Sequence, residues 1–190
     1  MADNKPKVLP EWQKDASVPS EYHTCEMTRG REFMIRLMTG ADPTLAIERF
    51  AREHNVKYGK IHATFMGGFQ PCKYYVWIPD YANPDNWHLE GTAVNTNLTM
   101  LTAIGGMISQ RPIEGSDETE PYVAMHFVAG GGWDAPTITG HMVEGTRVKG
   151  CMQCFITELL DIEALAPVDV WDEAYTYPEN FYRNTKNDKK

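Results

Sequence analysis

Two histidines, His126 and His141, lie on the two arms of one strand-like segment, "YVAMHFVAGGGWDAPTITGHM". A turn centred near Asp134 would place them opposite each other on paired antiparallel strands, where side chains lie ~5 Å apart. Neutral imidazoles are ligands for zinc, and near neutral pH they also accept and donate protons. The pair therefore predicts a metal or catalytic site, with two hydrogen-bonded structural histidines as the alternative.

Such a site needs further groups. Catalytic zinc typically takes three protein ligands and keeps one open position. His62 is the expected third ligand, because it lies in a strand-like run just before Gly67-Gly68, where we expect the sheet to bend. Glu144, three residues after His141, is the alternative, as a ligand or as a general base.

Three residues are candidates for binding a substrate beside this site. Arg36 carries a guanidinium that suits a carboxylate, although a surface ion pair is the alternative. Trp133, in the expected hairpin turn, and Tyr75 could line a pocket for a flat ligand.

The composition limits the class of protein. Of the 190 residues, 42% are hydrophobic and 23% are charged, which predicts a globular domain with a core. The formal net charge of −8 argues against a nucleic-acid partner, because such binding relies on Lys and Arg facing phosphates. No apolar run approaches the ~20 residues that span a bilayer, and no secretory signal is visible, so we expect a cytoplasmic protein with no membrane partner.

The first expected strand is "REFMIRLMTG", residues 31–40. Its alternation puts Phe33, Ile35 and Leu37 on one face and Arg36 on the other.

A helix is expected next, with Asp42 as the N-cap, Pro43 as the first residue, and Asn55 with Gly59 marking the stop. An apolar stripe should face the core and the charged residues should face water. The predicted inward residues are Ala46, Ile47, Phe50 and Ala51, and the predicted outward residues are Glu48, Arg49, Arg52 and Glu53.

After the helix, the chain reads mostly as strands: "KIHATFMGGFQ", "KYYVWIP", "NLTMLTAIGGMIS", the two histidine arms and "CMQCFITELLDI". Residues 111–121, acidic and flanked by prolines, are expected to form a solvated loop. Cys151 and Cys154 are three residues apart on one strand and so should point to opposite faces, which favours reduced thiols over a metal-binding pair.

The sequence therefore predicts one domain over residues 29–163, between extensions at 1–28 and 164–190. Its fold class is α/β of the α+β type, with a bent, largely antiparallel sheet and one long early helix.

The chain resembles the plants and prokaryotes conserved (PPC) domain family over roughly residues 30–160. The stretches that carry the resemblance are "FMIRLMTGADPTLAIERFAREHNVKYGKI", "MGGF" before "YYVW", "LEG", "GGMIS" and above all "MHFVAGGGWDAPTITGHMVEGTRV". The resemblance implies a stand-alone prokaryotic-type member that assembles as a homotrimer. Some members hold a divalent metal through the histidines of this signature.

Two departures from the family bear on function. Where the family often has His-x-His, this chain has Ala124-Met125-His126, so one ligand of that metal site is lost. Arg29-Gly30-Arg31 is followed by Glu32 instead of the proline of an AT-hook, so this segment is expected to begin a strand.

The function we expect is that of a lyase, isomerase or hydrolase acting on a polar carbonyl or carboxylate compound. His126, His141 and Glu144 are the expected catalytic residues. A divalent metal, zinc first, would be held by His126, His141 and His62. The alternatives are a ligand- or metal-binding regulator without turnover, and a DNA-associated protein, which the charge and the missing hook disfavour.

Overall fold

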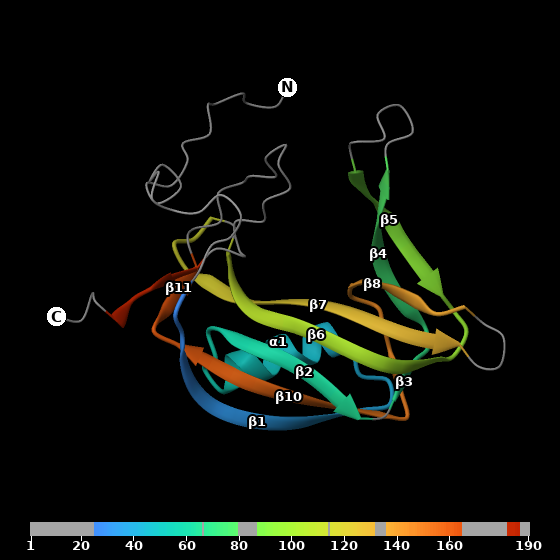
Figure 1. The fold of residues 1–190 in the computed structure, drawn as a ribbon, viewed down its shortest axis with the longest axis horizontal. Helices are drawn as coiled ribbons and strands as arrows, with labels where there is room; N and C mark the ends of the chain where they lie inside the picture. The colour runs from blue at the N-terminus through green and yellow to red at the C-terminus, as the bar shows by residue number, and fades with distance from the viewer. Residues whose placement is uncertain are drawn as a thin grey trace. The chain divides into compact units, whose positions relative to one another are not determined.

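The computed structural model describes residues 25–65, 67–79, 87–113, 115–131, 136–164 and 182–186 (Figure 1). The chain divides into two compact units, residues 29–160 and the two ends, 1–28 with 161–190. In the unit formed by the ends, β11 (Ile162–Ala164) pairs antiparallel with β12 (Tyr182–Asn184).

The unit of residues 29–160 holds the candidate site. It is built on one sheet of ten strands, whose main order is β1-β10-β2-β6-β7-β8-β4-β5. The strands are β1 (Thr28–Met38), β2 (Gly59–Phe65), β3 (Gly68–Phe69), β4 (Cys72–Pro79), β5 (Trp87–Asn95), β6 (Thr99–Pro112), β7 (Thr119–Gly131), β8 (Ile138–Met142), β9 (Val148–Lys149) and β10 (Cys151–Leu160). A mostly antiparallel sheet with one helix confirms the predicted fold class.

The helix, α1 (Pro43–Glu53), begins and ends for the reasons that the sequence indicates. The carboxylate of Asp42 accepts a hydrogen bond from the Leu45 amide, and Pro43 stands first, where a missing N–H costs nothing. After the helix, Asn55 turns the chain with a φ of 51°.

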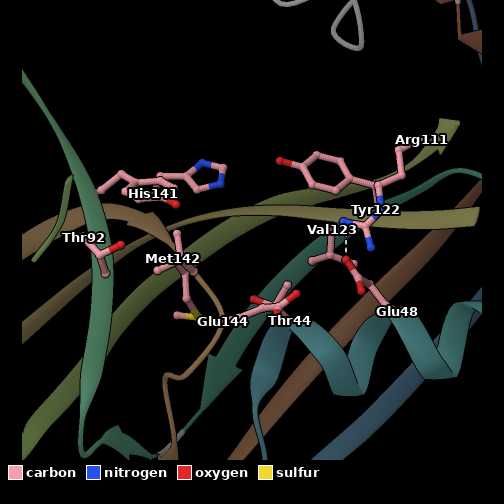
Figure 2. Close-up of a pocket in the computed structure, with 11 residues that line it drawn as sticks. Thr44, Glu48, Thr92, Arg111, Tyr122, Val123, His141, Met142 and Glu144 are labelled. Carbon is pink, nitrogen blue, oxygen red and sulfur yellow. Dashed lines mark hydrogen bonds between the residues drawn. The ribbon is translucent and has the colours of Figure 1, made fainter. Parts of the chain in front are cut away.

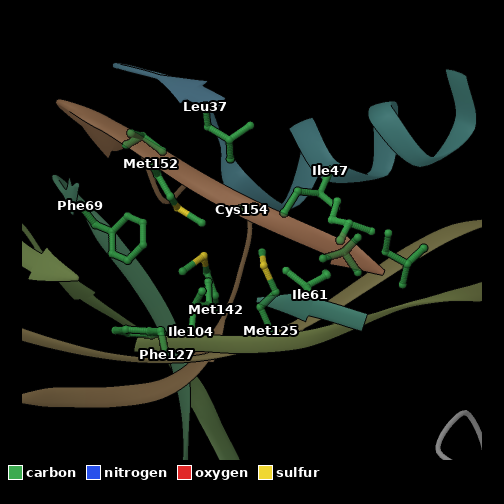
Figure 3. Close-up of a cluster of buried hydrophobic side chains, with 14 of the residues drawn as sticks. Leu37, Ile47, Ile61, Phe69, Ile104, Met125, Phe127, Met142, Met152 and Cys154 are labelled. Atoms are coloured by element: carbon green, nitrogen blue, oxygen red, sulfur yellow. The ribbon is translucent and has the colours of Figure 1, made fainter. Parts of the chain in front are cut away.

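Alternation along the strands gives the sheet two distinct faces. On the core face, Ile47 of α1 packs among side chains such as Ile61, Met125 and Phe127, all nearly inaccessible to solvent (Figure 3). On the outer face lie the residues between them, His126 among them. Every second residue of β7 is therefore removed from the core and available for chemistry or assembly.

Cysteines follow the same alternation. Cys154 is buried on the core face, whereas the Cys151 sulfur contacts Nη2 of Arg36 at 3.2 Å. The two thiols therefore point to opposite faces of β10, as predicted. None of the helices in the described ranges is long and apolar enough to cross a membrane.

Candidate functional site

His126 and His141 lie directly opposite each other on β7 and β8, which confirms the position predicted from the hairpin. Nδ1 of His141 is 3.3 Å from Nε2 of His126. The ring centroids are 5.1 Å apart and the rings stand almost perpendicular, at 89°. The two imidazoles therefore form a contacting pair on the outer face.

Tyr75 extends this pair onto β4. It is paired in register with His141, and the two rings stack with centroids 6.2 Å apart and an angle of 21°. Gly140 makes the close packing of β8 on β4 possible, since a Cβ there would lie 2.6 Å from the Tyr75 carbonyl oxygen. The structure thus brings three of the predicted site residues together: His126, His141 and Tyr75.

His62 lies in the same row across the sheet but further away. It is paired with Gly105 of β6, which is paired in turn with His126, so one strand separates the two histidines. Two strand spacings amount to ~10 Å of backbone. Within the described residues, no group of three or more His, Cys, Asp or Glu side chains is arranged to hold a metal.

A pocket of about 350 Å³ opens where β7 and β8 part (Figure 2). Their pairing ends at His126 and His141, although β7 extends back to Thr119. Helix α1 closes the gap, and the amide of Val123 on β7 donates to Oε1 of Glu48 at 3.3 Å. The pocket therefore lies between a helix, an unpaired strand edge and the end of β8.

His141 links the imidazole pair to this pocket, since its side chain lines the wall. Burial lowers the pKa of His141, and the neighbouring charge of His126 lowers it further. The ring is consequently neutral at pH 7, with one nitrogen that donates and one that accepts. In Figure 2 the ring of His141 faces the ring of Tyr122 across the pocket.

The predicted orientation of Glu48 on the helix is wrong. It was expected to face water, yet only 5% of it is exposed, and it lines the pocket. Burial raises the pKa of Glu48, while the Val123 amide and the charge of Arg111 act in the opposite direction. The signal for this position was present, because Thr44, Ile47, Glu48 and Ala51 have the i, i+3, i+4, i+7 spacing of one buried helix face.

Thr44 is the second pocket residue that α1 supplies. It is 6% exposed, and its Oγ1 has no hydrogen-bond partner within the part of the chain that the structure describes. A buried hydroxyl without a partner is costly in free energy. A ligand that forms a hydrogen bond with Thr44 would remove this cost.

Arg111 was not predicted, because residues 111–121 were expected to be a solvated loop. Instead β6 extends through Pro112, and β7 begins at Thr119. Nε of Arg111 donates to Glu120 at 2.8 Å, and its guanidinium lies 5.6 Å from the centre of the Tyr122 ring. The pocket thus holds a cation on β6, at a position paired with Glu120 of β7.

A clamp fixes α1 to the turn after β8. The carboxylate of Asp42 accepts from the Gly145 amide and from Nη1 of Arg147, each at 2.7 Å. Gly145 adopts a φ of 93°, which favours glycine. The clamp, formed by Asp42, Gly145 and Arg147, holds Glu144 at the pocket wall, where it was predicted to lie near His141.

The remaining predicted residues lie elsewhere. Arg36 is on β1, on the outer face, and contacts Cys151. It is not among the described residues that line the pocket. Trp133 lies outside the described residues.

Comparison with known proteins identifies the fold. The family model of the Plants and Prokaryotes Conserved (PCC) domain matches residues 25–160. None of the curated proteins matches the chain.

Three solved structures are similar to this one at identities that show a shared fold alone. A plant- and prokaryote-conserved (PPC) protein of Pyrococcus horikoshii has a TM-score of 0.56 and 18% identity, over 73% of this chain and 85% of that one. A metal-containing protein of Archaeoglobus fulgidus has a TM-score of 0.55 and 17% identity, over 73% and 86%. A hypothetical protein of Salmonella enterica has a TM-score of 0.52 and 17% identity, over 74% and 85%. With its sequence matched over residues 25–160 and its fold shared with these proteins, the chain belongs to the Plants and Prokaryotes Conserved domain family.

Proposed function

We propose that this protein is a cytoplasmic lyase, isomerase or hydrolase that moves a proton on a small carbonyl or carboxylate compound bound in the pocket. The observation that carries the proposal is the imidazole of His141, whose pKa burial lowers, in the wall of a cavity of about 350 Å³ that also holds Arg111. Removing a proton beside a carbonyl and returning it elsewhere is a step that lyases and isomerases share.

His141 is the proposed acid and base. Its Nδ1 faces His126, which leaves Nε2 as the nitrogen that a ligand can reach. His126 orients the ring and sets its tautomer, as the partner of a catalytic histidine commonly does. Glu144 lines the same wall and can accept a second proton.

Arg111 is the proposed binding group for a substrate carboxylate, in place of Arg36, which does not line the pocket. Its Nε is occupied by Glu120, and the terminal N–H groups of the guanidinium can form the fork that suits a carboxylate. Tyr75 would hold the compound from the β4 side, with its ring stacked on His141.

The test is proton exchange from solvent. The protein would be incubated in D₂O with pyruvate, oxaloacetate, 2-oxoglutarate and acetoacetate, one at a time, and deuterium incorporation followed by NMR. We expect exchange that His141→Gln reduces by about 10² or more. His54→Gln is the control, because His54 is exposed and packs on Phe33 and Phe50 instead.

Equal exchange in wild type and His141→Gln would contradict the catalytic role. Binding of one of these compounds without any exchange would favour the alternative, a regulator that binds a ligand without turnover.

A metal site is the second candidate, favoured by the distance within the imidazole pair. Two nitrogens bound to one tetrahedral zinc, each at about 2.0–2.1 Å, lie roughly 3.3 Å apart, and His126 and His141 have that separation, 3.3 Å. The Archaeoglobus fulgidus protein of similar fold is described as metal-containing.

The residues fit a metal only in part. Ala124, two residues before His126 on the same face, has no donor atom. His62 is one strand further away. A bound ion would take His126 and His141, with His62 or water completing its ligands, and would polarise a substrate carbonyl as a Lewis acid.

Elemental analysis of the purified protein tests this candidate. A metal content of about one per chain, lost in both His126→Ala and His141→Ala, would support it. A wild type without metal would contradict it and leave proton transfer by the imidazoles.

We also propose that the chain forms a homotrimer through the outer face of the sheet. That face exposes apolar side chains of β1, β7 and β10: Met34, Met38, Val128 and Phe155. Exposed apolar patches of this kind mark contacts between proteins. Light scattering should give the mass of three chains for the wild type and a lower mass for the Met34→Glu, Met38→Glu double variant, and a monomeric wild type would contradict the proposal.

A further inference from the structure

One wall of the pocket carries more acceptors than the protein itself satisfies. Only 5% of Glu48 is exposed, and among the described residues its carboxylate accepts one hydrogen bond, at Oε1 from the Val123 amide at 3.3 Å. None of the ion pairs found within the described residues includes Glu48. Arg111, the cation of the pocket, pairs with Glu120 instead.

Thr44 provides an independent observation at the same wall. It stands four residues before Glu48, so the two side chains lie on one face of α1. Its Oγ1 is buried, and none of the described residues forms a hydrogen bond with it. In Figure 2, Thr44, Glu48 and Glu144 lie along one side of the pocket, and Tyr122 lies on the other.

The charges on this side favour a cation. Glu48 and Glu144 both line the pocket, and each contributes negative charge when ionised. The positive end of α1 is already occupied, because the Asp42 carboxylate caps it and is held there by Arg147.

We infer that the compound bound in the pocket carries an ammonium group against Glu48 and Thr44 and a carboxylate against Arg111, as an α-amino acid does. An ammonium has three N–H donors, which match the oxygens of Thr44, Glu48 and Glu144. A volume of about 350 Å³ is near the lower end of known ligand pockets, which suits a molecule of this size.

This inference rests on the proposed function, because it concerns the same pocket, and it narrows the substrate class. The paired groups require both charges on one ligand. A compound with only a carboxylate would offer no N–H donor to Glu48 and Thr44. A simple amine would offer no carboxylate to Arg111.

The experiment is a matched series of probes on the wild-type protein. Binding of L-alanine, L-aspartate, L-glutamate and L-phenylalanine would be measured by titration calorimetry. Each would be compared with the 2-hydroxy acid of the same carbon skeleton and with the amine that lacks the carboxylate. At least one amino acid should bind about tenfold or more tightly than both of its analogues, since each analogue loses a charge-assisted contact.

Variants then locate the ammonium. Glu48→Gln should weaken the amino acid by about tenfold or more and leave the hydroxy acid unchanged, and Thr44→Val should weaken it by about threefold. Glu53→Gln is the control, because it removes an exposed carboxylate from the last turn of the same helix. The probe comparison in the wild type holds even if a variant fails to fold.

Two results would overturn the inference in different ways. Hydroxy acids that bind as tightly as amino acids, with Glu48→Gln unaltered, would remove the ammonium and leave the proposed function standing. An absence of binding by every probe would overturn the ammonium inference, and if proton exchange also failed with every oxo acid, the proposed function would fall with it.

Discussion

Two buried carboxylates on the same helix have opposite surroundings. Asp42, 8% exposed, accepts hydrogen bonds from the amides of Leu45 and Gly145 and from the guanidinium of Arg147. Glu48, 5% exposed, accepts one long hydrogen bond from an amide. Asp42 therefore stabilises the fold, whereas burying Glu48 costs free energy of folding.

Two buried threonines repeat the contrast. Oγ1 of Thr146, in the turn of the clamp, accepts from the Lys73 amide at 2.9 Å and donates to the Lys73 carbonyl at 3.0 Å. Oγ1 of Thr44 has no hydrogen-bond partner among the described residues. Asp42 and Thr146 have their partners at the clamp, whereas Glu48 and Thr44 line the pocket, which is why we place ligand binding there.

The largest effect is expected from Asp42→Ala. It removes the helix cap and two short hydrogen bonds to a buried carboxylate, so the free energy of unfolding should fall by about 3 kcal/mol. The figure is below that of a fully buried ion pair because the Arg147 side chain is 43% exposed. Urea unfolding at pH 7 measures it, and a loss under about 1 kcal/mol would mean that the clamp does not support the fold.

Thr146→Val should come next, with a loss of about 2 kcal/mol, because the Lys73 amide would lose the hydroxyl that it donates to. The Lys73 carbonyl would lose one of two donors and keep the Val143 amide. Thr44→Val is its matched counterpart: the same change of shape removes an unpartnered hydroxyl and should be neutral or slightly stabilising. The same unfolding measurement compares the two variants. Equal losses of stability would contradict the claim that Thr146 is satisfied and Thr44 is not.

A gain in stability, smaller than the losses at Asp42 and Thr146, is expected from Glu48→Gln. Burial raises the pKa of Glu48 in the folded protein, so the ionised carboxylate destabilises the fold above that pKa, and this penalty is absent at low pH where the group is protonated in both states. The variant should therefore be more stable than the wild type by on the order of 1 kcal/mol at pH 8, and the gain should vanish near pH 4.

Charged groups on three neighbouring segments also act on Glu48, so the measurement needs a control. Arg111 on β6, Glu120 on β7 and Glu144 after β8 all act on its charge. Glu53→Gln, exposed on the same helix, controls for the general effect of removing a carboxylate. A gain of equal size at pH 4 and pH 8 would show that titration of Glu48 is not its cause.

Local patterns in the sequence determined the elements and the imidazole pair. Asp42 and Pro43 mark the start of α1, since capping depends on residues within one turn. The alternation of β1 sets which residues face the core, since side chains on a strand have a period of two. His126 and His141 could be placed opposite each other because a short turn fixes the register of the strands that it joins.

Only the tertiary structure decided the pocket. Glu48 meets Val123 across 75 residues, and Asp42 meets Arg147 across 105, and no local pattern encodes such distances. Arg111 became a pocket residue because β6 and β7 extend into the two ends of a segment whose composition is that of a loop. Chemistry of single residues can be read along the chain, but which polar groups are left without partners depends on how distant segments pack.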